Sequence, residues 1–392
     1  MKRILALILA LTLSLAVAAC APAADAPASS AATDPSAAPD ASEPADASQP
    51  ADASEPADAP ADGAELALIT DLGTIDDKSF NQGAWEGLVQ YAEENGISHK
   101  YYQPTEQSTD AYLTAIGLAI TGGAKLIVTP GYLFEEPIFL AQEMYPEVTF
   151  VLLDGEPRNA DYSEYRTDAN AVAILYAEEQ AGFLAGYAAV KDGNTSLGFM
   201  GGMSVPAVIR YGYGFVQGAE QAATELGLAA GSITMNYHYT GDFAATPETQ
   251  AMAASWYQGG TQIIFACGGA VGNSVMAAAE AAGAKVIGVD KDQSGESDTV
   301  ITSAVKGLGA SVYSAISDFY AGGFPGGTTQ IFDAATNGVG LPMATSKFET
   351  FAQADYDAIF GQLASGSITL TKDTDVTQVT EIATTCVAIT VI

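Results

Sequence analysis

Basic residues are scarce in this chain of 392 residues. It contains 14 Lys and Arg against 47 Asp and Glu, which gives a formal net charge of −33. Nine of the acids fall within residues 21–62 and two of the bases within the first three residues, so the remainder holds 38 acids and 12 bases. A chain of this sign repels phosphate backbones and anionic lipid headgroups. We therefore expect no nucleic-acid binding and no electrostatic adhesion to membranes, and we read the acidity as a means of solubility.

Histidine is scarcer still, and the common catalytic motifs are absent. His99 and His238 each lie in a strand-like run of aromatic residues, which favours a structural role. The sequence has no HExxH, CxxC, GxSxG or P-loop motif, and the GGAVG of residues 268–272 lacks GxGxxG spacing. Adjacent carboxylates such as Asp76 and Asp77 have no evident proton partner. We therefore expect no catalytic residue, no metal and no cofactor.

Cysteine occurs three times, and two of these residues lie in apolar runs. Cys267 ends IIFAC and Cys386 begins CVAITVI, so two buried free thiols are the default interpretation. A single disulfide between them is the alternative, because an exported compartment permits one.

The third cysteine follows a leader-like segment. Two basic residues precede an apolar run over residues 4–19, which ends in small residues directly before Cys20. This order is typical of a secretory signal peptide, since the apolar run is short for a transmembrane span. The small residues before Cys20 resemble a bacterial lipobox, which predicts cleavage after residue 19 and lipid attachment at Cys20.

Residues 21–63 contain almost only Ala, Pro, Asp, Ser and Glu. Aromatic residues, large aliphatic residues, Lys and Arg are all missing from this stretch. Such a composition cannot bury enough apolar surface to offset the entropy of ordering. We expect a disordered acidic tether that holds a folded domain away from a membrane.

The first folded element is predicted to carry a ligand-binding edge. Residues 66–70 form an apolar run suited to a buried strand, and residues 80–95 have the apolar spacing of an amphipathic helix. The loop between them is short and acidic. In open α/β sheets, ligands bind where strand ends meet helix starts, so Phe80 and Asn81 should face a crevice. An aromatic ring, an amide and carboxylates suit a neutral ligand with a flat ring.

The remaining chain alternates short apolar strands with helices of ten or more residues. This alternation predicts parallel α/β sheets, and its restart near residue 167 predicts a second lobe with a cleft between the two. We expect lobe 1 to comprise residues 64–166 and 300–328, and lobe 2 residues 167–299 and 329–392. A helix is expected over residues 173–190, another over 347–363, and a late strand over 367–370.

Several motifs resemble one family in the same order along the chain. ITDLGTIDDKSFNQGAWEG, GYLFEEP, EEQAGFLAGYAA, FACGGAVG, VIGVDKDQ and ITSAVK are similar to the basic membrane protein family of substrate-binding lipoproteins. The resemblance covers about residues 66–341. It implies a two-lobed periplasmic-binding-protein type I fold that delivers purine nucleosides to the permease and ATPase of an ABC importer. It also implies a monomer outside the cytoplasm, anchored to the cell membrane by Cys20.

The resemblance further implies which residues contact the ligand. One aromatic ring from each lobe would enclose the base, and polar residues would bind the base edge and the ribose. The ligand-binding residues implied by position are Asp71, Phe80, Asn81, Glu136, Phe243, Gly269, Asp290 and Lys306. Glu136 departs from the family, which commonly has Asp there, and the Phe243 loop varies among members.

Other functions remain open on the sequence alone. A protein of the same fold could bind a sugar or another aromatic small molecule, although Trp85 and Trp256 are placed for packing within helices. A ligand sensor without transport would have the same sequence features. An enzyme such as a nucleoside hydrolase is disfavoured, because no nucleophile or metal cluster is evident.

Overall fold

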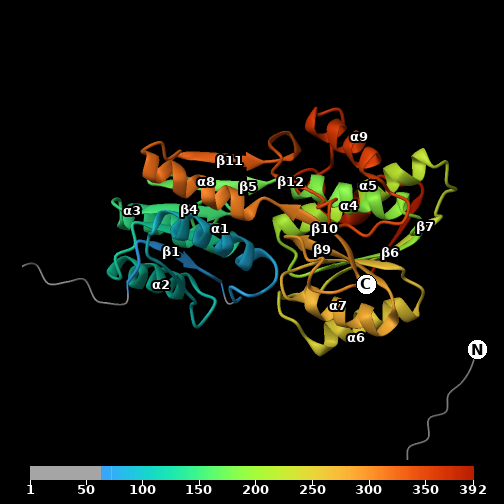
Figure 1. Ribbon diagram of the computed structural model, residues 1–392, viewed down its shortest axis with the longest axis horizontal. Helices are drawn as coiled ribbons and strands as arrows, with labels where there is room; N and C mark the ends of the chain where they lie inside the picture. The colour runs from blue at the N-terminus through green and yellow to red at the C-terminus, as the bar shows by residue number, and fades with distance from the viewer. Residues whose placement is uncertain (1–62, 72) are drawn as a thin grey trace, which may run out of the picture. The chain divides into compact units, whose positions relative to one another are not determined.

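The computed structural model describes residues 63–71 and 73–392 (Figure 1). The predicted signal peptide, the lipid attachment at Cys20 and the tether up to residue 62 lie outside the described residues. Within the described part, none of the helices is both long and apolar enough to span a bilayer.

The first sheet has six parallel strands in the order β11-β5-β4-β3-β1-β2. Its strands are β1 (Leu66–Ile69), β2 (His99–Tyr102), β3 (Leu126–Pro130), β4 (Thr149–Leu153), β5 (Ala171–Tyr176) and β11 (Thr328–Phe332). The helices on it are α1 (Phe80–Asn95), α2 (Thr109–Thr121), α3 (Glu135–Met144) and α8 (Leu308–Ala321), with a 3-10 turn η1 (Tyr132–Phe134). We call this sheet and its helices lobe 1.

Both faces of the first sheet are buried, as expected for a parallel sheet. Leu66 and Leu68 of β1 point into the core shared with α1 and α8, whereas Ala67 and Ile69 point into the core beneath α2 and α3. This alternation places every residue of β1 against a helix layer, which explains why the strand reads as a continuous apolar run.

The second sheet has seven strands in the order β12-β10-β9-β8-β6-β7-β13. Its strands are β6 (Ser196–Gly201), β7 (Ile233–Tyr239), β8 (Ile263–Cys267), β9 (Lys285–Asp290), β10 (Val300–Lys306), β12 (Val339–Gly340) and β13 (Val387–Val391); all pairs are parallel except β10 with β12. The other elements are α4 (Glu178–Lys191), α5 (Pro206–Glu225), α6 (Pro247–Gln258), α7 (Val271–Ala282) and α9 (Gln353–Ala364), with 3-10 turns η2 (Ala334–Thr336) and η3 (Val379–Glu381). These elements form lobe 2.

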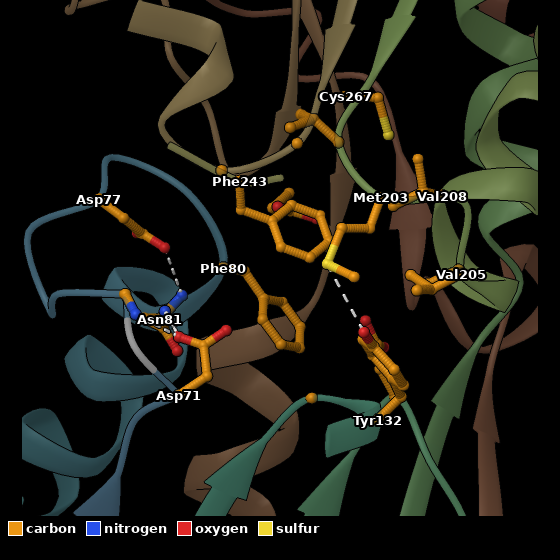
Figure 2. Close-up of a pocket in the computed structure, with 18 of the residues that line it drawn as sticks. Asp71, Asp77, Phe80, Asn81, Tyr132, Met203, Val205, Val208, Phe243 and Cys267 are labelled. Carbon is orange, nitrogen blue, oxygen red and sulfur yellow. Dashed lines mark hydrogen bonds between the residues drawn. The ribbon is translucent and has the colours of Figure 1, made fainter. Parts of the chain in front are cut away.

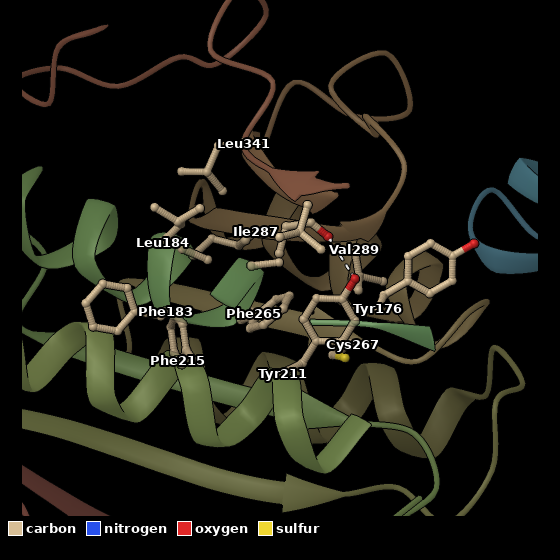
Figure 3. Close-up of a cluster of buried hydrophobic side chains, with 14 of the residues drawn as sticks. Tyr176, Phe183, Leu184, Tyr211, Phe215, Phe265, Cys267, Ile287, Val289 and Leu341 are labelled. Carbon is tan, nitrogen blue, oxygen red and sulfur yellow. Dashed lines mark hydrogen bonds between the residues drawn. The ribbon is translucent and has the colours of Figure 1, made fainter. Parts of the chain in front are cut away.

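The main core of lobe 2 lies between its sheet and the helix pair α4 and α5 (Figure 3). Phe183 of α4, Phe215 of α5 and Phe265 of β8 are buried there. The Tyr211 hydroxyl reaches the Ala304 carbonyl of β10 at 3.3 Å, so the core also ties α5 to the strand that leads back to lobe 1. Cys267 and Cys386 are both buried and unpaired, which confirms the default interpretation of two free thiols.

Three connections cross between the lobes, and they change the expected lobe ranges. β10 belongs to the second sheet although residues 300–328 were expected in lobe 1. β5 and β11 belong to the first sheet although β5, and β11 from residue 329 on, were expected in lobe 2. Ala177 donates its backbone N–H to Phe332 at 2.9 Å, and Gly307 donates to Gly338 at 2.8 Å, so the crossing segments lie side by side. The order of elements along the chain does not indicate which sheet each strand joins.

The secondary structure differs from expectation at three places. Residues 171–176 form β5, so the helix expected from residue 173 begins at Glu178. Residues 171–176 lie inside the first sheet, where they pair with β4 and β11. Strands of a parallel sheet are buried on both faces and therefore have continuous apolar sequences, which resemble the start of a buried helix. The last helix begins at Gln353 instead of residue 347, and residues 367–370 form no strand.

Candidate functional site

A cavity of ≈ 320 Å³ lies where the carboxyl ends of the two sheets face each other. Lobe 1 contributes residues that follow β1, β3 and β4, and lobe 2 contributes residues at the ends of β6, β7, β8, β9 and β10. Strand ends of parallel sheets are the usual ligand sites of this fold class. We call this space the cleft cavity.

Two aromatic rings from opposite lobes point into the cleft cavity (Figure 2). Phe80 is the first residue of α1 in lobe 1, and Phe243 lies in the loop after β7 in lobe 2. Gly131, in the turn after β3 beside the Phe80 ring, has φ 113°, a backbone conformation that favours glycine. Between these rings the cavity has an apolar middle that suits a flat, weakly polar group.

One end of the cavity carries a carboxylate and an amide. Asp71 Oδ1 accepts hydrogen bonds from the Gly73 backbone N–H at 2.6 Å and from Asn81 Nδ2 at 3.2 Å. Burial raises the pKa of Asp71, although these bonds act in the opposite direction. The Asn81 side-chain oxygen is buried and has no hydrogen-bond partner among the described residues. A buried, unpaired acceptor costs stability unless a ligand donates to it.

Asp77 holds the start of α1 in place beneath this end. Its carboxylate accepts backbone N–H bonds from Ser79 at 2.8 Å, Asn81 at 3.0 Å and Gln82 at 3.1 Å. These donors are among those left without partners at a helix start, and a carboxylate there also complements the helix dipole. Asp77 is buried, and by these bonds it fixes the start of the helix that carries Phe80 and Asn81.

The other end of the cavity is built around one buried cation. The Lys306 Nζ lies 2.5 Å from Asp154 Oδ2, 3.4 Å from Glu178 Oε1 and 3.7 Å from Asp290 Oδ1. Burial alone lowers the pKa of Lys306, but the three carboxylates outweigh it and the pKa is raised. The Nζ also lies 4.6 Å from the centroid of the Phe80 ring, so the charged end and the aromatic middle are contiguous.

The charges at this end do not balance. Three carboxylates surround Lys306, and the second cation nearby, Arg210, lies 3.8 Å from Glu178 Oε2 and is also paired with Asp373. Asp154 Oδ1 is buried without a hydrogen-bond partner among the described residues. Burial raises the pKa of Asp290 and of Glu178. Asp290 also accepts a hydrogen bond from the Ser79 hydroxyl at 2.6 Å, which joins the two lobes across the cavity. This end therefore favours a ligand that donates hydrogen bonds and disfavours an anion.

Seven of the eight ligand residues expected from the sequence line the cleft cavity. They are Asp71, Phe80, Asn81, Phe243, Gly269, Asp290 and Lys306. Glu136 does not line it. Glu136 is the second residue of α3, and its carboxylate accepts a hydrogen bond from the Thr109 hydroxyl of α2 at 2.7 Å and lines a neighbouring cavity instead.

Several lining residues were not expected from the sequence. Asp154 directly follows β4, and the strand-end rule that indicated Asp71 could also have indicated it. Tyr132 and Met203 approach each other from opposite lobes, with 3.7 Å between the hydroxyl and the sulfur (Figure 2). Their residue types carry no signal for such a contact. Among the described residues, no group of His, Cys, Asp or Glu is arranged to hold a metal ion.

Comparison with known proteins agrees with this geometry. Residues 64–365 match the Bmp family, described as ABC transporter substrate-binding protein PnrA-like. The chain belongs to the Bmp family. Its role is accordingly non-enzymatic solute binding, with permease and ATPase partners, at the extracytoplasmic side of a membrane.

Individual relatives support the same membership. The chain is 30% identical over 323 residues to the ABC transporter nucleoside-binding protein BmpA of Lactococcus lactis subsp. cremoris, covering 76% of this chain and 87% of that protein. It is 33% identical over 255 residues to basic membrane protein A1 of Borrelia garinii subsp. bavariensis, covering 63% and 70% respectively. An ABC transporter solute-binding protein from Aeropyrum pernix K1 shares the fold with a TM-score of 0.68 at 23% identity, covering 78% of this chain and 93% of that one.

Proposed function

We propose that this Bmp-family protein binds purine nucleosides in the cleft cavity and delivers them to an ABC importer. The proposal rests on the order in which polar and aromatic groups line the cavity. Asp71 and Asn81 form a polar end, Phe80 and Phe243 an aromatic middle, and Asp290 and Lys306 a second polar end. A nucleoside has the same order of groups: a base edge, a flat ring and a sugar rich in hydroxyls.

The spacing of the strands supports this assignment. Asp71 follows β1 and Asp154, the partner of Lys306, follows β4, with β3 between them in the sheet. Neighbouring strands are about 4.8 Å apart, so the two polar ends are separated by roughly 10 Å. This separation suits a nucleoside lying along the strand ends, with its base enclosed by the two rings. Stacking on such rings contributes roughly 1–3 kcal/mol for each base.

The charge of the cavity favours a nucleoside over a nucleotide. Ribose hydroxyls can donate to Asp290 and to the unpaired oxygen of Asp154. A phosphate at the same end would face the carboxylates of Asp154 and Asp290, which line the cavity beside Lys306. The name of the Lactococcus relative, a nucleoside-binding protein, supports the same ligand class.

The attachment to the membrane is part of the proposal. Cys20 follows a signal-peptide-like leader, and lipidation there would tether the two lobes through the acidic segment of residues 21–62. The protein would act as a monomer. Labelling of cells with radioactive palmitate should mark the wild-type protein and leave a Cys20→Ser variant unlabelled.

A thermal-shift panel tests the ligand class. A ligand at a hundredfold excess over its Kd stabilises the protein by about 2.7 kcal/mol, which corresponds to a rise in Tm of roughly 5 °C. We expect this rise with guanosine, inosine or adenosine and none with hexoses. If all three nucleosides leave Tm unmoved while a sugar raises it, nucleoside binding is wrong. Phe80→Ala should abolish the shift and keep a cooperative melting transition, because Phe80 is only partly buried and its ring points into the cavity.

A further inference from the structure

A second cavity of ≈ 280 Å³ adjoins the cleft cavity on its lobe 1 side. It lies in lobe 1, between the start of α2, the start of α3 and the loop of residues 155–162. Gln107, Tyr132 and Leu133 line both cavities, so these three side chains form the boundary between them. We call the second cavity the annex.

The annex carries polar groups that the fold leaves incompletely paired. Tyr112 lines it, and its hydroxyl has no hydrogen-bond partner among the described residues, although the residue is only 2% exposed. Glu136 uses one carboxylate oxygen to accept from Thr109 at 2.7 Å, and its other oxygen has no bond within the described part of the chain. A buried hydroxyl without a partner is costly in a cavity that stays empty, and a ligand that bonds to it relieves the cost.

An ion pair and a cation–ring contact connect the residues of the outer wall of the annex. The guanidinium of Arg158 is fixed by Glu135 at 2.7 Å and lies 3.3 Å from the centroid of the Tyr162 ring. Tyr162 has φ 62°, a left-handed conformation that is unusual for an aromatic residue. Ala160 and Tyr162 are exposed, so the annex reaches solvent on this side. A polar chain in the annex could therefore extend toward solvent on this side.

We propose that the annex receives a polar substituent attached to the base edge of a bound purine nucleoside. This inference rests on the proposed function, since it requires the base edge to face Asp71 and Asn81. With the sugar at the Lys306 end, the proposal places the far edge of the six-membered ring toward Gln107 and Tyr132, which line both cavities. A short chain ending in a hydroxyl would pass this boundary, donate to Glu136 and bond to the Tyr112 hydroxyl. The ligand class is therefore purine nucleosides bearing hydroxyalkyl groups on the base.

Calorimetric titration of the purified full-length chain tests this inference. The probes are adenosine, adenosine with a hydroxyethyl group on its exocyclic amine, and adenosine with the same group on the carbon between the two nitrogens of the six-membered ring. At least one substituted probe should bind within about threefold of adenosine, or more tightly, because the annex supplies space and partners. If both substituted probes bind more than about tenfold more weakly than adenosine, the annex receives no substituent and the inference is overturned.

Two variants separate the annex from the cleft cavity. Ala160→Phe fills the annex from its exposed side, and it should weaken the accepted substituted probe at least about tenfold while adenosine changes less than about twofold. Tyr112→Phe should weaken only the substituted probe, by about fivefold, through loss of one hydrogen bond. Ala230→Phe, at an exposed turn of lobe 2 that lines neither cavity, should change neither affinity.

The possible failures are distinguishable. If Ala160→Phe weakens both ligands equally, the substituent does not enter the annex and the inference is wrong while nucleoside binding stands. If adenosine, guanosine and inosine all fail to bind the wild-type protein, the proposed function falls and the inference falls with it. Circular dichroism melts of each variant identify any that are unfolded, and Tyr112→Phe, which removes one oxygen atom, provides the test if the larger substitution unfolds.

Discussion

At the scale of single residues, the position of Phe243 depends on a glycine that does not touch the proposed ligand site. Gly202 follows β6, and a Cβ built on it would lie 2.4 Å from Phe243 Cδ1 and 2.8 Å from the Asp242 carbonyl oxygen. Real Cβ atoms do not approach this closely, so a side chain at residue 202 must displace the ring or the loop that carries it.

Gly202→Ala should therefore weaken ligand binding without contacting the ligand. We expect roughly a tenfold loss of nucleoside affinity by calorimetry, because half of the aromatic enclosure moves. Gly295→Ala is the matched control in the same lobe, since a Cβ there meets nothing within 4 Å. Equal affinities for Gly202→Ala and the control would show that Phe243 does not position the ligand.

The amide of Asn81 gives a second test at this scale. Asn81→Asp keeps the size of the side chain but replaces the Nδ2 donor, which lies 3.2 Å from Asp71 Oδ1, with an acceptor. Two carboxylates in contact repel, so we expect at least a tenfold loss of affinity at neutral pH that is partly recovered on acidification. Titrations at two pH values measure this recovery, and a loss that is independent of pH would contradict the explanation.

Individual site residues were predictable where a motif fixed them to a strand end. Asp71, Phe80 and Asn81 follow β1 within one short loop, and their placement at the cavity edge follows from that position. Glu136 was not predictable, because one helical turn decides whether a side chain at the start of α3 faces the cleft cavity or the annex. The contact of Tyr132 with Met203 joins residues 71 positions apart, and no local pattern reports it.

At the scale of elements, α4 and α5 pack through glycines that bring their backbones together. Cβ atoms built on Gly182 and Gly186 of α4 would lie 2.0 Å and 2.1 Å from carbonyl oxygens of α5. Gly214 and Gly218 of α5 would meet carbonyl oxygens of α4 at 2.0 Å and 1.9 Å. The glycines of both helices thus serve close packing, which holds α5, with Val208 and Tyr211, at the edge of the cleft cavity.

Glycine-to-alanine substitutions in two helices should have opposite effects on stability. Gly214→Ala forces α4 and α5 apart and should lower the free energy of unfolding by about 1–3 kcal/mol. Gly361→Ala in α9, where a Cβ meets nothing within 4 Å, should raise it by roughly 0.5–1 kcal/mol, because alanine restricts the unfolded chain. Denaturant titrations measure both, and a neutral Gly214→Ala would mean that the helices can separate without loss.

Element boundaries were predictable where caps marked them and uncertain where apolar runs continued. The end of α1 at Asn95, with Gly96 in the left-handed conformation, follows the helix-stop rule. The run from Ala171 to Tyr176 is apolar throughout and leads into a good helix former, so its pattern fits either a buried strand or the start of a long helix. Only its pairing with β4 and β11 decides between them.

At the scale of the whole molecule, the exchange of strands between lobes was not predictable. β10 ends in lobe 2 and the next helix, α8, packs on α1 in lobe 1. The sequence shows a strand followed by a helix whether the two elements belong to the same lobe or to different lobes. This exchange has a consequence for the site, since Lys306 at the end of β10 meets Asp154 of lobe 1 and Glu178 at the start of α4 beside two of the crossing connections.

Buried carboxylates should make the whole molecule more stable in mild acid than at neutral pH. Burial raises the pKa of Asp77 to about 6, and it also raises the pKa of Asp71, Glu135 and Asp290. Because these folded-state values lie above the unfolded ones, the folded protein holds more protons, and stability falls as pH rises through this range. For Asp77 alone, a shift of this size corresponds to at most about 3 kcal/mol. Repulsion within a chain of net charge −33 acts in the same direction.

Melting curves between about pH 4 and pH 8 should therefore show the highest Tm near pH 5. At lower pH the folded protein loses stability as its ion-paired acids become protonated. Glu225 is an example: burial raises its pKa, but hydrogen bonds from Lys191 and Tyr187 outweigh burial and leave the pKa lowered. In about 1 M NaCl, where the Debye length is about 3 Å, the surface repulsion is screened and the buried contribution should remain. Asp77→Asn should flatten the decline between about pH 5 and pH 7 whatever its absolute Tm, because its amide does not titrate in this range. A decline that vanishes in salt and is unchanged in Asp77→Asn would assign the pH dependence to the surface charge alone.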